Sequence, residues 1–152
     1  MLRRVKRLLL LLAAVIAAGA VLSAGCGGKA TATPTPSGAP TPPGGILTLS
    51  LASNAALAQT NGSASFDFAG LGWIVVAHRG ARLDASGWVT VTQTCTRDGC
   101  LVAWTGTAGG FVCPCDHAIY AADGTVVANA PAPLHAFTTA FDGTNVVIDL
   151  SS

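Results

Sequence analysis

Two short cysteine-containing segments constrain the fold of this chain more than any other feature. The first reads Cys-Thr-Arg-Asp-Gly-Cys at positions 95–100, and the second reads Cys-Pro-Cys-Asp-His-Ala-Ile-Tyr at positions 113–120. Their four cysteines allow three disulfide connectivities. A bond between Cys113 and Cys115 is disfavoured, because residues two apart on an extended chain lie roughly 6.6 Å apart with parallel side chains. The two remaining connectivities both join the first segment to the second.

Short runs of alternating apolar and polar residues predict β-strands around these segments. The runs are bounded by turn residues and lie at 47–51, 65–68, 73–78, 88–92, 101–104, 111–112, 125–128, 137–141 and 145–150. The last two are connected through Asp142-Gly143, a pair typical of a tight hairpin turn, and 53–59 is the one stretch with helical spacing. The pattern predicts an all-β sandwich or barrel of antiparallel strands, with the cysteine segments as loops at one end.

The first 26 residues have the composition of a bacterial export signal. Four basic residues precede an apolar stretch at 8–22, and Leu-Ser-Ala-Gly-Cys at 22–26 resembles a lipobox cleavage site. Cleavage there leaves Cys26 as a lipidated N-terminus, which predicts a protein anchored on the extracytoplasmic face of the cell membrane. The alternative is an uncleaved helix, although the apolar stretch falls short of the ~20 residues that a membrane span needs.

A linker and one small domain are predicted to follow the signal. Residues 27–45 combine Gly, Thr, Ser and Ala with five prolines, which is typical of a semi-rigid tether, and residues 46–152 suit a single domain. Export places the four remaining cysteines in an oxidising compartment, where disulfides persist. After cleavage, four basic residues stand against seven aspartates, a net charge of −3. This balance argues against nucleic acid as a partner.

The two cysteine segments resemble the metal-binding loops of the Rieske iron–sulfur family. In that family they read Cys-Thr-His-x-Gly-Cys and Cys-Pro-Cys-His-Gly-Ser-x-Tyr/Phe, and one Cys and one His from each loop hold a 2Fe-2S cluster. The likeness continues through Asp-Gly-Thr-Val-Val at 123–127 and Ala-Pro-Ala-Pro at 130–133, and it covers approximately residues 70–150. It implies a Rieske-type antiparallel β-sandwich and a role in electron transfer.

The resemblance also implies a role for individual residues of the two segments. Cys100 and Cys115 form a disulfide between the loops, whereas Cys95 and Cys113 are the sulfur ligands of one iron. The hydroxyl of Tyr120 bonds a cluster-ligating sulfur and thereby tunes the cluster. These assignments come from the family pattern and not from the spacing of the residues.

The two positions that hold histidine in the family hold Arg97 and Asp116 in this chain. A guanidinium stays protonated and has no acceptor lone pair, so Arg97 cannot bind iron. Asp116, as a carboxylate, and His117, displaced by one position, are the remaining candidate ligands for the second iron. His78 and His135 are expected on the surface or in loops, because neither sits in a ligand-like cluster.

Two functions are therefore open. The first is a redox carrier that passes one electron through an exposed 2Fe-2S cluster, at most the electron-transfer component of an oxidoreductase. The second is a clusterless binding or structural module, in which Cys95 and Cys113 close a second disulfide and Arg97 pairs with Asp116. A four-cysteine zinc site fits the cysteine spacings poorly. The expected partners are the membrane, through the lipid, and a membrane-associated redox or structural protein.

Overall fold

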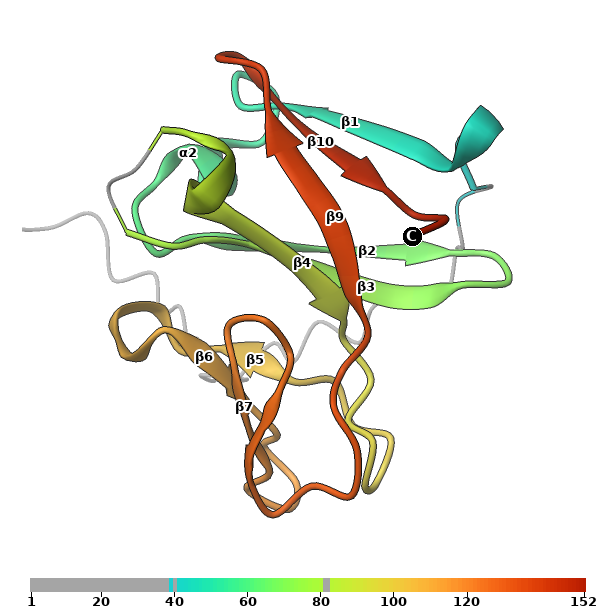
Figure 1. Ribbon diagram of the computed structural model, residues 1–152, viewed down its shortest axis with the longest axis vertical. Helices are drawn as coiled ribbons and strands as arrows, with labels where there is room; N and C mark the ends of the chain where they lie inside the picture. Colours follow the sequence, from blue (N-terminus) through green and yellow to red (C-terminus); the bar gives the residue numbers. More distant parts are fainter. Residues whose placement is uncertain (1–38, 40, 81–82) are drawn as a thin grey trace, which may run out of the picture. The chain divides into compact units, whose positions relative to one another are not determined.

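The structure, a computed structural model, describes residue 39, residues 41–80 and residues 83–152. The predicted export signal, Cys26 and most of the predicted tether lie outside the described residues. Figure 1 shows the described part as strands joined by loops and short helical turns. Its elements are η1 (Pro43–Gly45), β1 (Ile46–Ser50), α2 (Ala55–Ala58), β2 (Ser63–Phe68), β3 (Gly72–His78), η2 (Ala85–Gly87), β4 (Trp88–Thr92), β5 (Ala103–Trp104), η3 (Gly106–Ala108), β6 (Gly110–Val112), β7 (Ile119–Ala121), β8 (Val126–Ala128), β9 (Ala136–Phe141) and β10 (Asn145–Asp149).

The strands form two antiparallel sheets. The larger sheet has the order β1-β10-β9-β4-β3-β2, and the smaller sheet has the order β5-β6-β7-β8. In Figure 1 the smaller sheet lies below the larger one, and the loops that carry the cysteines lie at its lower end. This arrangement confirms the predicted antiparallel β-sandwich with both cysteine segments at one end.

The first hydrophobic core lies within the larger sheet. Its buried members are Leu49, Leu57, Phe68, Ile74, Val76, Trp88, Phe137, Val146, Ile148 and Leu150. The two outermost strands, β1 and β2, both contribute to this core, so the sheet curves until its edges share one interior. Burial of apolar side chains is the main force that holds this half together.

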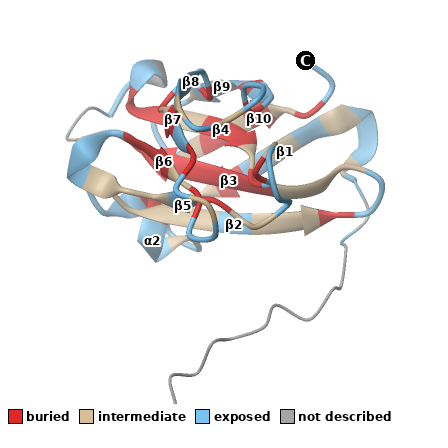
Figure 2. Ribbon diagram, turned by 90° about the horizontal axis from the view of Figure 1, so that it is seen from below, coloured by how far each residue is buried: buried red, intermediate tan, exposed pale blue. Residues whose placement is uncertain are grey.

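Strand β3 separates this core from a second one. Side chains alternate between the two faces of a strand. Ile74 and Val76 therefore pack into the first core, whereas Val75 and Ala77 pack into the second. Figure 2 shows β3 as a buried strand in the middle of the molecule. Burial on both faces explains why its sequence is a continuous apolar run.

The second core connects β3 and β4 to the cysteine loops. Its buried members are Val75, Ala77, Val91, Cys95, Val102, Phe111, Cys113, Ala118, Tyr120 and Leu134. Two cysteines and a tyrosine belong to this core, so the position of the loops depends on packing against the larger sheet.

Strand β7 and the β9–β10 turn differ from the sequence-based expectations. Residues 119–121 form strand β7. This strand was not predicted, because residues 113–120 were assigned as a whole to a loop. In the turn, the Asp142 carboxylate accepts hydrogen bonds from the backbone N–H groups of Thr144 and Asn145 at 2.9 and 2.7 Å. The N–H of Asp142 also donates to the carbonyl oxygen of Asn145 at 3.1 Å, and Gly143 has a φ of 100°. The two residues at the tip of the turn are therefore Gly143 and Thr144, one position later than predicted.

The expectation that His78 lies at the surface is wrong. It is the last residue of β3, its side chain is 1% exposed, and it lies opposite Trp88 in the β3–β4 register. The two rings stack with centroids 4.4 Å apart, and the His78 Nδ1 lies 3.0 Å from the carbonyl oxygen of Gln59. A stacked aromatic neighbour covers the imidazole, which the local sequence did not reveal.

The chain just before β1 contacts the edge of the larger sheet. The backbone N–H of Ala39 donates to the carbonyl oxygen of Asp67, and the N–H of Ala69 donates to the carbonyl oxygen of Ala39, both at 3.0 Å. No helix in the described part of the chain has the length and apolar character that crossing a membrane requires.

Candidate functional site

The first cysteine loop is a tight turn that is closed by two backbone hydrogen bonds. The N–H of Cys95 donates to the carbonyl oxygen of Cys100 at 2.8 Å, and the N–H of Gly99 donates to the carbonyl oxygen of Cys95 at 3.1 Å. Gly99 has a φ of 78°, a left-handed conformation that glycine adopts without strain. The sequence thus supplies glycine where the turn requires it.

The second loop has the same backbone pattern. The N–H of Cys113 donates to the carbonyl oxygen of Ala118 at 2.9 Å, and the N–H of His117 donates to the carbonyl oxygen of Cys113 at 3.1 Å. His117 occupies the position that Gly99 occupies in the first loop, and it too is left-handed, with a φ of 60°. The two loops are therefore equivalent turns, in which Cys95 of the first loop corresponds to Cys113 of the second.

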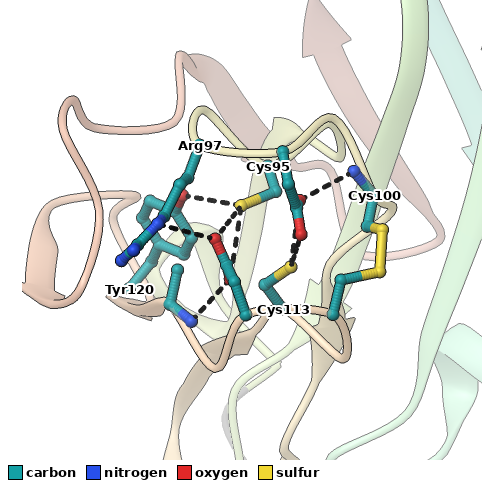
Figure 3. Close-up of a disulfide and its surroundings, with 9 residues drawn as sticks. Cys95, Arg97, Cys100, Cys113 and Tyr120 are labelled. Carbon is teal, nitrogen blue, oxygen red and sulfur yellow. Dashed lines mark hydrogen bonds and ion pairs between the residues drawn. A yellow bond between two sulfur atoms is a disulfide. The ribbon is translucent and has the colours of Figure 1, made fainter.

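One disulfide joins the two loops. Cys100 is bonded to Cys115, with their Cα atoms 6.4 Å apart, as the family resemblance implied. Figure 3 shows this bond beside a cluster of side chains from both loops. The link holds the loops together at one side of that cluster.

Cys95 and Cys113 are free thiols in this structure. They are 3% and 0% exposed, and both belong to the second core. They face the same small region, but they are not bonded to each other, in contrast to the clusterless hypothesis with its second disulfide. Burial raises the pKa of the Cys113 thiol from 9.0 to about 12, because an apolar environment disfavours the thiolate.

Two aspartates converge on these thiols, one from each loop. The Asp98 carboxylate lies 3.4 Å from the sulfur of Cys113, and both Asp116 carboxylate oxygens lie 3.9 Å from the sulfur of Cys95. The ligand atoms of these four residues all lie within 4.8 Å of one another. Each carboxylate thus contacts the thiol of the opposite loop.

Each of the two carboxylates is oriented by a hydrogen bond from the backbone N–H two residues further along the chain. The N–H of Cys100 donates to Asp98 Oδ1 at 3.0 Å, and the N–H of Ala118 donates to Asp116 Oδ1 at 2.9 Å. The bond from Ala118 is the main reason why the pKa of Asp116 lies below its usual value, because a donated hydrogen bond favours the charged carboxylate. Asp116 is consequently an anion at neutral pH.

Arg97 lies beside this cluster with its guanidinium engaged by the protein. Its Nε lies 3.5 Å from Asp116 Oδ2, and its Nη1 donates to the carbonyl oxygen of Asn129 at 3.0 Å. The Arg97 side chain is 55% exposed and that of Asp116 is 15% exposed. The two residues in the former histidine positions therefore form a partly exposed ion pair.

Tyr120, in strand β7 directly after the second loop, connects this strand to the first loop through hydrogen bonds. Its hydroxyl oxygen lies 3.3 Å from the sulfur of Cys95 and 3.0 Å from the hydroxyl of Thr96, and it accepts the N–H of Thr96 at 3.2 Å. Thr96 in turn donates its hydroxyl to the carbonyl oxygen of Ala132 at 2.7 Å. Burial and the nearby sulfur of Cys95 raise the pKa of Tyr120. The contact with a potential ligand sulfur is the one that the resemblance implied.

The three histidines do not contribute ligands to the cluster. The imidazole of His117 belongs to neither group of mutually close ligand atoms among the described residues. His135 is exposed, with its Nε2 2.8 Å from the carbonyl oxygen of Ser152, and His78 is stacked on Trp88. Of the two candidate ligands for a second iron, only Asp116 faces the thiols.

The residues present do not fit the ligand set of a Rieske cluster. That cluster needs two neutral imidazole nitrogens on one iron. Arg97 offers only donors, and its guanidinium contacts Asp116 and Asn129. One carboxylate remains where two nitrogens are required.

Asp98 is the functional candidate that sequence reasoning missed. Its position in the family pattern is unspecified, so the resemblance gave it no role. A signal was nevertheless present, because Cys95 and Cys113 are each followed three residues later by aspartate. The repeat becomes meaningful once the two loops are seen to be equivalent turns.

Comparison with known proteins finds relatives that match a third to a half of this chain. The chain is 30% identical over 76 residues to the cytochrome b6-f complex iron-sulfur subunit of Chlorobaculum thiosulfatiphilum, which covers 49% of this chain and 39% of that protein. It is 45% identical over 51 residues to the subunit of the same name from Synechococcus sp. (strain WH7803), which covers 34% of this chain and 28% of that protein. The chain spans 28–41% of the length of the curated relatives it matches.

The fold agrees with a solved structure over most of the described chain. The cyanobacterial plasma membrane Rieske protein PetC3 from Synechocystis PCC 6803 superposes with a TM-score of 0.51 and 30% sequence identity. The match covers 67% of this chain and 97% of that one. No family model matches the sequence.

Proposed function

Because this chain belongs to the Rieske family, whose members act in iron–sulfur electron transfer, we propose that it is a membrane-tethered, extracytoplasmic member that works without the two-iron cluster, as a binding or structural module. The observation that carries this proposal is the ion pair of Arg97 with Asp116. A cation with no lone pair stands where the family needs a neutral nitrogen donor.

The loops are held in place by interactions that need no cluster. The Cys100–Cys115 disulfide joins them covalently, and Tyr120 connects the second loop's strand to Cys95 and Thr96 of the first. Thiol–carboxylate contacts occupy the region between the loops. These interactions support a domain that keeps its shape with the family's metal ligands altered.

The tether in this proposal rests on the sequence. The basic and apolar signal with its lipobox supports lipidation at Cys26. The solved relative is described as a plasma membrane protein, which agrees with a membrane location. The partner would be a membrane-associated protein that recognises the exposed end of the loops.

A second candidate function is one-electron transfer through a 2Fe-2S cluster with an altered ligand set. It is favoured by the relatives, which are named as iron-sulfur subunits, and by two retained features, the Cys100–Cys115 disulfide and the contact of Tyr120 with Cys95. If a cluster binds, Cys95 and Cys113 are its sulfur ligands and it supplies a one-electron redox centre.

Iron and acid-labile sulfide analysis of the purified chain decides between the two functions. The proposal expects far less than one iron and one sulfide per chain, with no Rieske-type visible or electron paramagnetic resonance spectrum. Two irons and two sulfides per chain would establish the cluster and reject the proposal. The paired change Arg97→His with Asp116→His restores one nitrogen to each loop, so it should permit cluster insertion during reconstitution with iron and sulfide.

The two single variants are the matched controls for that restoration. Arg97→His and Asp116→His should each take up less cluster than the double variant, because one imidazole still leaves an iron short of a ligand. Equal uptake by a single variant and the double variant would show that the two positions do not act together.

Membrane attachment is tested with Cys26→Ser. This change removes the lipidation site, so the chain should leave the membrane fraction or accumulate unprocessed. Unchanged attachment of a processed chain would reject the lipid anchor. The control is Ser23→Thr, which alters the same segment but keeps Cys26.

A further inference from the structure

The two cysteine loops carry the same pair of side chains at the same positions. Each loop begins with a buried cysteine and has an aspartate three residues later, as Cys95 with Asp98 and Cys113 with Asp116. Each aspartate accepts a backbone N–H from the residue two positions further on. A ligand pair separated by two residues is the spacing that zinc-binding loops use.

These two pairs meet in a crossed arrangement between the loops, around the thiols of Cys95 and Cys113 that Figure 3 labels. Asp98 of the first loop contacts the thiol of Cys113, and Asp116 of the second loop contacts the thiol of Cys95. All four ligand atoms lie within 4.8 Å of one another. The thiols are 3% and 0% exposed, so two buried soft donors and two oxygen donors surround one point.

The spacing of these atoms matches a single ion better than a two-iron cluster. Bonds of about 2.0–2.3 Å to oxygen and sulfur place the donors of a tetrahedral ion roughly 3.3–3.8 Å apart. The Asp98–Cys113 and Asp116–Cys95 separations of 3.4 Å and 3.9 Å are close to that range, and the other pairs of ligand atoms lie within 4.8 Å. A two-iron cluster holds its protein ligands as two pairs, one on each iron, and therefore spreads them further.

We propose that Cys95, Asp98, Cys113 and Asp116 bind one divalent metal ion of the zinc class. This inference rests on the proposed function, in which the loops do not hold a two-iron cluster. Binding forms two metal–sulfur and two metal–oxygen bonds, and it releases the two thiol protons to solvent. Zinc accepts this mixture of thiolate and carboxylate ligands and undergoes no change of oxidation state.

The residues around the four ligands orient them for this task. Cys100 and Ala118 donate backbone N–H groups to the two carboxylates, and Arg97 contacts the remaining oxygen of Asp116. Such outer contacts fix the direction of metal ligands. Arg97 is compatible with this metal site, because its positive charge offsets part of the negative charge of two thiolates and two carboxylates.

The test uses the full chain, purified anaerobically in mild detergent, with two free thiols verified by titration after gentle reduction. The chain is loaded with Zn²⁺, and the bound zinc per chain is measured by elemental analysis. A second sample is loaded with Co²⁺, whose visible absorption reports a tetrahedral thiolate site. Asp98→Asn is the diagnostic variant, because its amide oxygen can still accept the Cys100 N–H while losing the carboxylate charge. Asp123→Asn is the matched control, since Asp123 accepts the N–H of Thr125 in the same way but lies outside the cluster.

The proposal expects one zinc per chain, no sulfide, and Zn²⁺ affinity at least ~10-fold weaker in Asp98→Asn than in Asp123→Asn. No stoichiometric zinc on the reduced chain, with iron and sulfide also absent, would reject the metal site and leave the proposed function standing. Two irons and two sulfides would reject both. Equal affinities of the two aspartate variants would reject Asp98 as a ligand, and with it the site as described.

Discussion

The larger sheet and the cysteine-loop half of this protein are held together by different forces. The interior of the larger sheet consists of aliphatic and aromatic side chains such as Ile74, Val146 and Ile148. The core beneath the loops also contains valines, a phenylalanine and a leucine, but two cysteines, two alanines and a tyrosine make up half of its buried members. A disulfide and several polar contacts reinforce it.

Loops with little apolar surface need specific bonds to hold one conformation. Burial stabilises in proportion to apolar area, which the larger sheet has in abundance. The loops replace area with a covalent link and with directed hydrogen bonds. Changes in the larger sheet should therefore unfold the whole domain, whereas changes in the loops should act on the loops first.

The largest expected effect is in the larger sheet, at Ile148. This residue of β10 is fully buried in the first core, so Ile148→Ala should lower the free energy of unfolding by about 4 kcal/mol. The loss should be global and visible in a single denaturant transition. Val127→Ala, at an exposed position of β8, is the control and should cost less than about 0.5 kcal/mol. A loss below about 1 kcal/mol at Ile148 would contradict the role given to the first core.

Removal of the inter-loop disulfide should have the next largest effect. Cys100 and Cys115 are 15 residues apart, and a cross-link of that length contributes about 3 kcal/mol by restricting the unfolded chain. The double change Cys100→Ser with Cys115→Ser should also expose the loop amides to hydrogen exchange before those of β10. If protection falls equally in both regions, the two halves form one cooperative unit and the distinction between them is lost.

A smaller effect is expected from Tyr120→Phe, which removes only a hydroxyl group. That hydroxyl contacts the Cys95 sulfur and both the N–H and the hydroxyl of Thr96, so its loss should cost about 1–2 kcal/mol. Alkylation of Cys95 by a thiol reagent should become faster. The control is Thr139→Val, which removes hydroxyl contacts in the larger sheet and should leave the alkylation rate unchanged.

The smallest effect concerns pH and the buried thiol of Cys113. In the folded chain burial raises the pKa of this thiol to about 12, against 9.0 ordinarily. The unfolded chain therefore loses this proton first as pH rises above about 9, which favours unfolding across the window up to pH 12. Between pH 8 and pH 10 the metal-free, reduced domain should lose about 1.4 kcal/mol. Chemical denaturation at both pH values checks this, and a loss of the same size in Cys113→Ser would assign it to other groups.

Much of the fold could be predicted from local patterns. The period-two alternation identified most strands, because a strand with one buried face must alternate. Strand β7 escaped detection because Ile119 and Tyr120 belong to the cysteine segment. The surface position predicted for His78 failed because burial there depends on Trp88, which lies on the neighbouring strand.

In the candidate site too, some features could be predicted from the sequence and others depend on contacts between distant segments. The likeness of the two segments to a family pattern implied the Cys100–Cys115 disulfide, and the chemistry of arginine alone showed that Arg97 cannot bind a metal. The pairing of Arg97 with Asp116 was one of the arrangements expected for these positions, and the structure contains it.

Which groups are present could be read from the amino-acid sequence alone: four cysteines in two segments, and arginine and aspartate where the family has histidine. How these groups meet follows from the three-dimensional fold, which brings Asp98 against Cys113 and Asp116 against Cys95 and leaves His117 outside the group of close ligand atoms. Contacts between the loops depend on the packing of the loops onto β3 and β4 and on the matching turns that aim each side chain. That information lies in the three-dimensional arrangement of distant segments and not in the spacing within either one.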